Sequence, residues 1–224
     1  MYHFFLKRLF DIIFSIIALL ILSPLLIPII IVLLVTGEHY VFYSQKRVGL
    51  KNSRFKIHKF ATMLKNSPNM GSGSITLRKD PRVLPFGAFL RKTKINELPQ
   101  ILNVLFGDMA LIGPRPQMEA DFFRFQQQYQ DRIYNVKPGI TGIGSIIFRD
   151  EEKLVSETTM APAEFFAKHI DPYKCELEIW YQKNLTFWTD CKILFLTAWV
   201  IIFSNSKLPQ KMFKNLPQKP ALSG

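Results

Sequence analysis

The longest apolar stretch of the chain runs from Leu9 to Val35 and is interrupted only by Asp11, two serines and two prolines. A straight α-helix of these 27 residues would be about 40 Å long, which exceeds the ~30 Å hydrocarbon core of a bilayer. The pattern therefore predicts a membrane helix. A cleaved signal peptide is disfavoured because the run is too long and no small-residue cleavage site follows it.

Ser23 and Pro24 lie near the middle of this segment, and Pro28 follows one turn later. A proline removes a backbone donor and clashes with the preceding turn, so a kink is expected. After the kink the helix either continues across the bilayer or turns back, so that both of its ends lie on one side. The serine hydroxyl can satisfy the freed backbone groups in both arrangements.

Basic residues stand on both sides of the apolar segment, with more of them on its C-terminal side. They are Lys7 and Arg8 before it, and Lys46, Arg47, Lys51, Arg54 and Lys56 after it. The positive-inside rule places the richer flank, and with it the body of the chain, in the cytoplasm. The net charge of +12 indicates an anionic partner. A nucleic acid is disfavoured because the cations flank an apolar anchor and no nucleic-acid-binding motif is present.

The region after the membrane segment mixes short strand-like pieces, at residues 40–43 and 55–58, with helical patterns. One helix is predicted from the i, i+3, i+4, i+7 spacing of a buried face formed by Leu98, Ile101, Leu102 and Leu105. The expected fold is α/β-like, mainly helical, with a few short strands.

The C-terminal part contains a second apolar stretch, residues 193–203, which is too short to span a bilayer. Aromatic residues favour the headgroup region. Those that surround the stretch are Trp180, Tyr181, Phe187, Trp188 and Trp199. We therefore expect an amphipathic helix over residues 180–203 that lies in the membrane interface, with an ordinary buried core helix as the alternative. Residues 204–224 carry four lysines and three prolines, a composition typical of a disordered tail.

Asn96 and Glu97 stand at the centre of the first dense polar cluster. Four cations precede them along the chain: Arg82, Arg91, Lys92 and Lys94. A carboxylate at a helix start, next to free backbone donors and cations, can hold Mg²⁺ against a diphosphate. The alternative is structural, with Asn96 as a helix N-cap and Glu97 as a favourable first-turn acid.

Two arginines near glycine-rich turns are further candidates for phosphate binding. Arg115 lies in the rigid sequence Gly113-Pro114-Arg115-Pro116, which suits bidentate phosphate contact. Arg149 follows a second glycine-rich turn, residues 137–144. The sequence contains no Walker A, GxGxxG or GxSxG pattern, so those types of nucleotide and hydrolase site are excluded.

Taken together, these motifs resemble the bacterial sugar transferases, also described as small monotopic phosphoglycosyl transferases. The resemblance covers about residues 5–203, and its motifs occur in order along the chain. They are Lys7-Arg8-Leu9-Phe10-Asp11, Ser23-Pro24, Gln45-Lys46-Arg47-Val48-Gly49, Lys59-Phe60-Ala61-Thr62-Met63, Asp80-Pro81-Arg82, Glu97-Leu98-Pro99-Gln100, Asn103-Val104-Leu105, Gly107-Asp108-Met109, Gly113-Pro114-Arg115-Pro116 and Lys137-Pro138-Gly139-Ile140-Thr141-Gly142.

The resemblance implies transfer of a sugar-1-phosphate from a UDP-sugar to a polyprenyl phosphate, undecaprenyl phosphate being the expected form. Mg²⁺ is the implied cofactor, with Glu97 as its ligand, and Arg91, Arg115 and Arg149 bind substrate phosphates. The implied organisation is a re-entrant membrane hairpin over residues 1–36, broken at Ser23 and Pro24. A cytosolic catalytic domain over residues 37–203 follows, at the bacterial inner membrane. Membrane lipid and other glycan-assembly enzymes are the further partners.

One departure from the family pattern concerns the nucleophile. In the family an aspartate precedes the glutamate and attacks the β-phosphorus, whereas this chain has Asn96. An amide is a poor nucleophile. The first hypothesis is an active enzyme in which Glu97 or Asp108 replaces the aspartate, or in which the lipid phosphate attacks directly. The second is a trapped form, and the third is an inactive scaffold that binds nucleotide-sugar or lipid. Ala61 and Ile143 replace an arginine and a tryptophan that are usual in the family.

Overall fold

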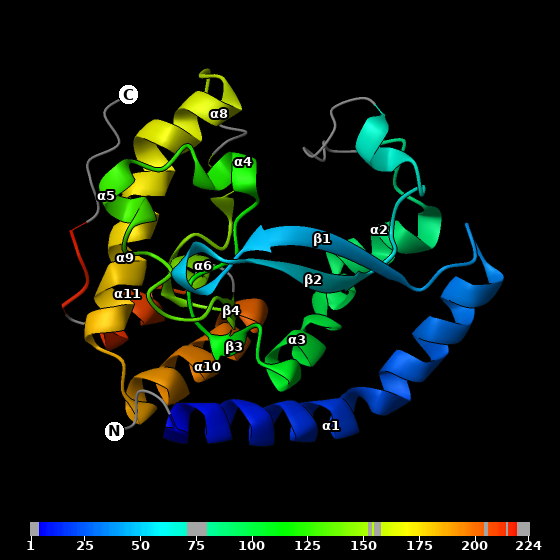
Figure 1. Ribbon diagram of the computed structural model, residues 1–224, viewed down its shortest axis with the longest axis horizontal. Helices are drawn as coiled ribbons and strands as arrows, with labels where there is room; N and C mark the ends of the chain where they lie inside the picture. The colour runs from blue at the N-terminus through cyan, green and yellow to red at the C-terminus, as the bar shows by residue number, and fades with distance from the viewer. Residues whose placement is uncertain are drawn as a thin grey trace.

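The computed structural model describes residues 5–70, 80–151, 154, 158–203, 206–213 and 215–218. Helices predominate and the strands are few and short (Figure 1), so the expectation of a mainly helical α/β-like fold is confirmed. The main elements are α1 (Lys7–Val35), β1 (Phe42–Val48), β2 (Arg54–Phe60), α2 (Pro85–Lys92), η4 (Ile95–Glu97), α3 (Gln100–Phe106), β3 (Ala110–Ile112), α4 (Glu119–Phe122), α5 (Gln127–Gln130), β4 (Gly139–Thr141), α6 (Ile143–Ile147), α8 (Pro162–Phe165), α9 (Asp171–Lys183), α10 (Phe187–Ile202) and α11 (Leu208–Met212).

Helix α1 is long and apolar enough to cross a membrane, by length and composition. Only 11% of its most apolar 18-residue window is buried, so it is not a core helix. Figure 1 shows a bend between its two halves, which the internal prolines Pro24 and Pro28 explain. The hydroxyl of Ser23 donates a hydrogen bond of 2.8 Å to the carbonyl of Leu20, as expected beside a proline.

The first turn of α1 is fixed to the body by buried charges. Lys7 Nζ lies 3.0 Å from Asp11 Oδ1 and 3.0 Å from Asp190 Oδ2 on α10. Asp11 Oδ1 also accepts a 3.0 Å hydrogen bond from the backbone N–H of Leu111 in β3. The neighbouring Arg8 donates to two carbonyls at the end of α3. Four elements thus meet at the start of the membrane helix.

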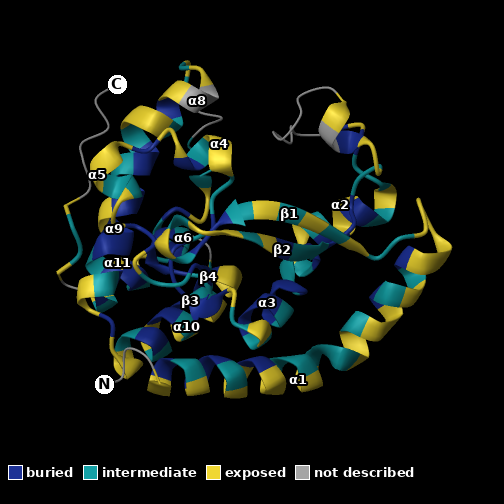
Figure 2. Ribbon diagram, in the orientation of Figure 1, coloured by how far each residue is buried: buried dark blue, intermediate teal, exposed yellow. Residues whose placement is uncertain are grey.

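The C-terminal half of α1 packs against a different part of the body. Ile29 and Leu33 are buried in a cluster with Phe60 of β2 and Leu90 of α2. Between the two attached ends, Figure 2 shows exposed residues along the outward side of α1. Leu20 and Ile21 are exposed apolar residues of this stretch. The helix therefore lies along one side of the molecule and contacts it at both ends.

Two small sheets position the polar groups. Strands β1 and β2 form an antiparallel hairpin that pairs Phe42 with Phe60. Strands β3 and β4 pair in parallel and bring two glycine-rich turns together. A Cβ at Gly113 would lie 2.3 Å from the carbonyl oxygen of Lys137, and one at Gly139 would lie 2.1 Å from the nitrogen of Gly113. Only glycine permits this close backbone approach.

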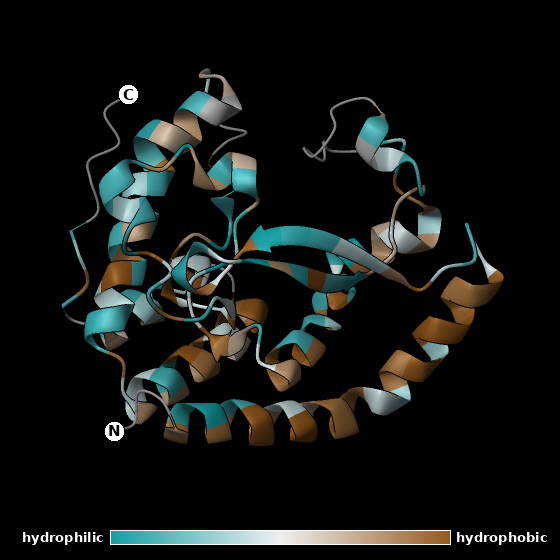
Figure 3. Cartoon of the chain, viewed as in Figure 1, coloured by the Kyte–Doolittle hydropathy of each residue, from teal (hydrophilic) through white to brown (hydrophobic). Residues whose placement is uncertain are grey.

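The expectation of one amphipathic helix over residues 180–203 is wrong in two respects. Helix α9 ends at Lys183, and α10 begins after Thr186, whose side chain caps it by accepting from the N–H of Thr189 at 3.1 Å. Helix α10 is also apolar on both faces, because Leu196 is buried in the core while Trp188 is 71% exposed. Figure 3 shows apolar residues along both α1 and α10. The exposed apolar face suits a membrane surface.

The described part of the expected disordered tail contains structure. Residues Leu208–Met212 form α11, and Phe213 is buried with its ring centroid 5.4 Å from that of Trp180. The carbonyl of Pro217 accepts a 3.0 Å hydrogen bond from the hydroxyl of Tyr173. One aromatic side chain and one backbone contact therefore hold this segment against α9.

Candidate active site

Glu97 is presented by the short 3₁₀ turn η4, directly before α3. Lys94, which precedes the turn, has a left-handed backbone with φ of 60°. This conformation costs a non-glycine residue roughly 1 kcal/mol, so the surrounding packing must hold it. Pro99, rather than Asn96, occupies the N-cap position of α3. The structural alternative, in which Asn96 caps the helix, is therefore wrong.

Two cations from distant segments meet the carboxylate of Glu97. Lys59 Nζ, from β2, lies 2.8 Å from Glu97 Oε1, and Arg115 Nη2 lies 3.4 Å from the same oxygen. The side chain of Glu97 is 21% exposed and that of Lys59 is 15% exposed. Both hydrogen bonds reach Oε1, and no hydrogen bond to the second oxygen, Oε2, is formed by the described residues.

A third cation, Arg47 of β1, lies close enough to interact electrostatically with Arg115 and Glu97. Its guanidinium donates to the carbonyl of Pro116 at 3.2 Å and to Gln45 Oε1 at 2.6 Å. The hydroxyl of Tyr134 donates a 2.8 Å hydrogen bond to the carbonyl of Arg115. These contacts fix the turn that carries Arg115. We call Glu97, Lys59, Arg115 and Arg47 the Glu97 cluster.

The pKa values in the Glu97 cluster follow from burial and mutual charge. Burial alone would raise the pKa of Glu97, but the charges of Arg115 and Lys59 hold it well below its usual range. Burial lowers the pKa of Lys59, and Glu97 opposes that shift. Burial also lowers the pKa of Arg47, and the neighbouring Arg115 adds to the effect. Three cations around one carboxylate leave a surplus of positive charge that an anionic ligand would neutralise.

The side chain of Asn96, next to Glu97, is buried. It is 7% exposed, and its Oδ1 has no hydrogen-bond partner among the described residues. An unpaired buried carbonyl costs about 1–3 kcal/mol, so its retention next to Glu97 calls for a functional explanation. The catalytic assignment of Asn96 remains a prediction.

The other two predicted phosphate ligands, Arg91 and Arg149, come from elements outside the Glu97 cluster. Arg91 of α2 is half-buried, and its Nη1 lies 3.5 Å from Thr62 Oγ1, just beyond the end of β2. Arg149 is exposed, and its nearest described partner is the carbonyl of Ile201 at 3.5 Å. No hydrogen bond or ion pair in the described part of the chain joins Arg149 to Glu97.

Two polar residues of the quoted motifs have structural surroundings. Arg82 donates to both carboxylate oxygens of Asp80 and to the backbone carbonyls of Ser67 and Met70, so it organises that turn. Asp108 follows the far end of α3, where Asn103 Nδ2 donates to it at 3.3 Å. The charges of Asp108 and Arg8 both act on Lys137. Arg8 and Lys137 are not the cations that contact Glu97, which are Lys59 and Arg115.

Sequence reasoning did not assign Lys59 and Arg47 to the site. Both lie in family motifs quoted above, but nothing local connects them to Glu97. Their only signal in the sequence is a positive charge close to the strand-like segments. The pairing of Arg47 with Phe55 and of Lys59 with Tyr43 puts both cations on one face of the hairpin.

The arrangement fits a Mg²⁺ ion whose ligands come partly from the protein and partly from the substrate. The described residues contain no group of three or more His, Cys, Asp or Glu side chains that could hold a metal ion alone. Mg²⁺ commonly binds one or two carboxylates together with substrate phosphates and water. Glu97 Oε2 and the unpaired Oδ1 of Asn96 are two oxygen donors of the required kind.

Comparison with known proteins connects this site to a family. The family described as bacterial sugar transferase matches residues 2–204. The chain is 34% identical to the undecaprenyl-phosphate galactose phosphotransferase of Salmonella typhimurium, over 88% of this chain and 40% of that protein. It is 34% identical to the UDP-glucose:undecaprenyl-phosphate glucose-1-phosphate transferase of Klebsiella pneumoniae, over 86% and 39%.

A shorter relative matches along most of its length. The chain is 36% identical to the uncharacterized sugar transferase EpsL of Bacillus subtilis, over 89% of this chain and 88% of EpsL. By contrast, the chain spans about two fifths of the galactose and glucose transferases. On the match over residues 2–204 and these identities, the chain belongs to the bacterial sugar transferase family.

Proposed function

We propose that the chain transfers a sugar-1-phosphate from a UDP-sugar to a polyprenyl phosphate at the cytoplasmic face of the bacterial inner membrane. The reaction releases UMP and begins a lipid-linked glycan. The observation that carries this proposal is the Glu97 cluster, a charged site beside a long, exposed apolar helix. A diphosphate would neutralise its surplus of positive charge, and the helix gives access to a lipid acceptor.

The names of the relatives support the substrate class. Those proteins are named for undecaprenyl phosphate together with galactose, N-acetylgalactosamine or glucose. The sugar differs among relatives of similar identity, so overall similarity does not select one sugar for this chain.

The re-entrant arrangement of α1 belongs to the same proposal. Lys7 at one end and Leu33 at the other both pack against the body, which carries the Glu97 cluster. A helix that crossed the bilayer would carry one of these ends to the opposite side and break its contacts. We therefore propose that α1 enters the membrane at the bend and returns, with both ends cytoplasmic.

In the proposed reaction, Lys59, Arg115 and Arg47 bind the diphosphate of the UDP-sugar. Glu97 would hold Mg²⁺ through Oε2, and Asn96 Oδ1 is the neighbouring oxygen donor. Mg²⁺ supplies neutralisation of the phosphate charge when bound. An oxygen of the lipid phosphate forms a bond to the β-phosphorus, and the bond from that phosphorus to the bridging oxygen breaks. The bridging oxygen and its electron pair leave with UMP.

Direct attack by the lipid phosphate is favoured over a covalent enzyme intermediate. The low pKa of Glu97 and its two cations make its carboxylate a weak nucleophile. Asp108 lies at the far end of α3, where its charge acts on Lys137 rather than on the Glu97 cluster. Neither carboxylate is therefore proposed to attack.

The test measures UMP release by the purified chain with Mg²⁺, with and without polyprenyl phosphate, across a panel of UDP-sugars. The expected result is turnover only when the lipid is present, and none with Glu97→Ala. Asn96→Asp should restore the covalent route and release about one UMP per enzyme without lipid. A fully active Glu97→Ala variant would contradict the role of Glu97.

A non-catalytic scaffold is the second candidate, favoured by Asn96 in the position of the family aspartate. It predicts nucleotide-sugar or lipid binding without UMP release by the chain as it stands. Turnover by Asn96→Asp alone would support this alternative, because the fold and the cations would then be competent and the amide would be the missing element.

A further inference from the structure

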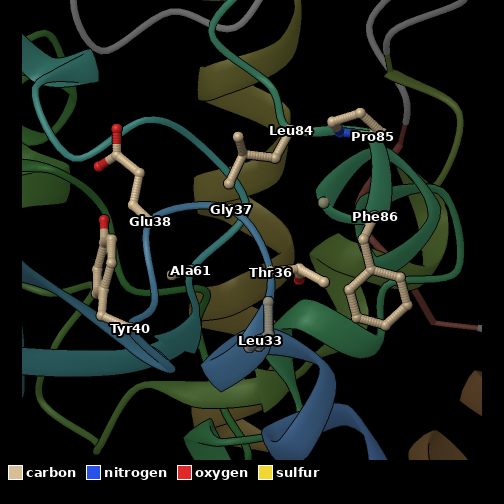
Figure 4. Close-up of a pocket in the computed structure, with 10 residues that line it drawn as sticks. Leu33, Thr36, Gly37, Glu38, Tyr40, Ala61, Leu84, Pro85 and Phe86 are labelled. Atoms are coloured by element: carbon tan, nitrogen blue, oxygen red, sulfur yellow. The ribbon is translucent and has the colours of Figure 1, made fainter.

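A pocket with a cavity volume of about 260 Å³ lies where α1 ends and α2 begins (Figure 4). Its inner wall contains the buried residues Leu33, Ala61 and Gly87, and Leu84 and Phe86 line it from α2 and the residue before it. The end of α1 beside it is exposed and apolar, with Leu34 and Val35 at 50% and 66% exposure. The proposed membrane surface therefore continues to the pocket.

The lining of the pocket selects an uncharged occupant. Its walls are mostly hydrocarbon, and its one carboxylate, Glu38, lies at the exposed rim and accepts a hydrogen bond from the backbone of Lys65. A carboxylate repels the phosphates of a nucleotide or of a lipid headgroup. The volume is also below that of most sites for whole small-molecule ligands, so the pocket suits a segment of a chain.

Two elements lead from this pocket to the cations of the candidate site. Ala61 continues the β2 ladder, because its N–H donates to the carbonyl of Val41 at 2.8 Å. Side chains two residues apart share a face of a strand and lie roughly 7 Å apart, so Ala61 and Lys59 are neighbours on one face. Along α2, Arg91 lies five residues, roughly 7.5 Å, beyond Phe86. Arg91 also reaches Thr62, next to Ala61.

The hydrocarbon part of an occupant would therefore lie in the apolar cavity. The end of the occupant would lie close to Lys59 and Arg91. We infer that the pocket binds the isoprenoid segment nearest the phosphate of the polyprenyl phosphate acceptor. This inference rests on the proposed function for the identity of the lipid. Binding there would hold the acceptor phosphate beside the Glu97 cluster and keep the rest of the chain along α1.

Photo-crosslinking tests the inference without requiring turnover. The full chain in lipid nanodiscs is irradiated with polyprenyl phosphate that carries a diazirine in the isoprene unit next to the phosphate, and adducts are mapped by mass spectrometry. Adducts on Leu84 or Phe86 that unlabelled polyprenyl phosphate displaces are the expected result. Adducts confined to α10, or equal labelling of the pocket by a diazirine phospholipid, would overturn the inference.

Substitution of Ala61 tests the pocket by filling it. Ala61→Leu should reduce the adduct yield and raise the KM for polyprenyl phosphate by about tenfold, as expected when roughly two methylene groups are excluded from an apolar site. The KM for the UDP-sugar should not change. Ala88→Leu, on the exposed face of α2, is the matched control. Leu84→Trp fills the pocket from another wall if Ala61→Leu does not fold.

The outcomes separate the inference from the proposed function. Crosslinking in the pocket without sugar transfer would support the inference and contradict the proposed function. Sugar transfer by a chain whose pocket is not labelled, with Ala61→Leu and Leu84→Trp indistinguishable from Ala88→Leu, would overturn the inference alone.

Discussion

Lys59 and Glu97 are 38 residues apart in the sequence, yet their side chains meet at 2.8 Å. This ion pair joins the β1–β2 hairpin to the turn before α3. It also balances charge, because the only other cation on the same carboxylate oxygen among the described residues is Arg115. Because the pair is partly buried, removing one partner should cost more free energy than breaking an ion pair on the surface.

Lys59→Met should reduce the rate of transfer by about 100-fold, the loss typical of removing one stabilising donor from an active site. Without Lys59, the pKa of Glu97 should rise toward its usual value, because Lys59 is one of the cations that lower it. The acidic limb of the pH–rate profile should therefore move to higher pH. Both changes are measured by UMP release as a function of pH.

Lys56→Met is the control for this substitution. Lys56 lies three residues earlier on the same strand and pairs across the hairpin with Lys46, so it faces away from Lys59. Its substitution should leave the rate and the pH profile within twofold of the original, roughly the scatter of surface substitutions. Equal losses in both variants would show that the effect is on the hairpin rather than on Glu97.

The buried carboxyl of Glu178 is expected to make the stability of the chain depend on pH. It is fully buried on α9, and burial raises its pKa to about 7 from an ordinary 4.5, although Lys174 and the backbone N–H of Gly144 oppose the shift. The folded state therefore holds this proton more tightly than the unfolded state does. Stability should fall as pH rises from about 4.5 to 7, by roughly 3 kcal/mol in total.

Glu178→Gln should remove this loss, because a neutral amide does not ionise. Denaturant unfolding in detergent should find the variant more stable than the original at pH 8, by up to about 3 kcal/mol, and nearly equal at pH 4.5. Glu176→Gln, an exposed site two residues away, should change neither value. An equal difference at both pH values would contradict ionisation of Glu178 as the cause.

Lys7 holds two buried carboxylates, Asp11 and Asp190, at 3.0 Å each. Lys7→Met removes the cation that they share, so it should lower the free energy of unfolding by about 3–5 kcal/mol. Thermal unfolding at pH 7 measures this loss, with the exposed Lys183→Met as control. An unchanged stability would mean that the start of α1 is not held by this ion cluster.

The elements that were predicted correctly carry their signal in adjacent residues. The apolar run and its prolines predicted α1 and its bend, and the Gly-Pro-Arg-Pro sequence predicted an irregular turn that presents Arg115. Lys59 could not be assigned to the site in the same way. Its position depends on the register of the hairpin, and a shift of one residue would turn it to the other face.

The C-terminal region was less predictable because weak local signals competed. Thr186 is a good N-cap residue, but the aromatic pattern on both sides of it favoured one continuous helix over two. In the tail, lysines and prolines indicated disorder, whereas Phe213 finds a place beside Trp180. A single tertiary contact of this kind cannot be read from composition.

The exposed apolar face of α10 leads to the last prediction. Trp188 is 71% exposed, Ile201 and Ile202 are exposed on the same helix, and the rings of Phe10 and Phe187 lie 5.8 Å apart, so α10 adjoins α1. An exposed tryptophan on such a face favours the headgroup region of a bilayer. Brominated acyl chains in nanodiscs should therefore quench its fluorescence. Trp188→Phe should remove roughly half or more of the total quenching, whereas Trp180→Phe, at a packed position, should remove little. Equal quenching in both variants would place α10 away from the lipid and leave α1 as the sole membrane contact among the described helices.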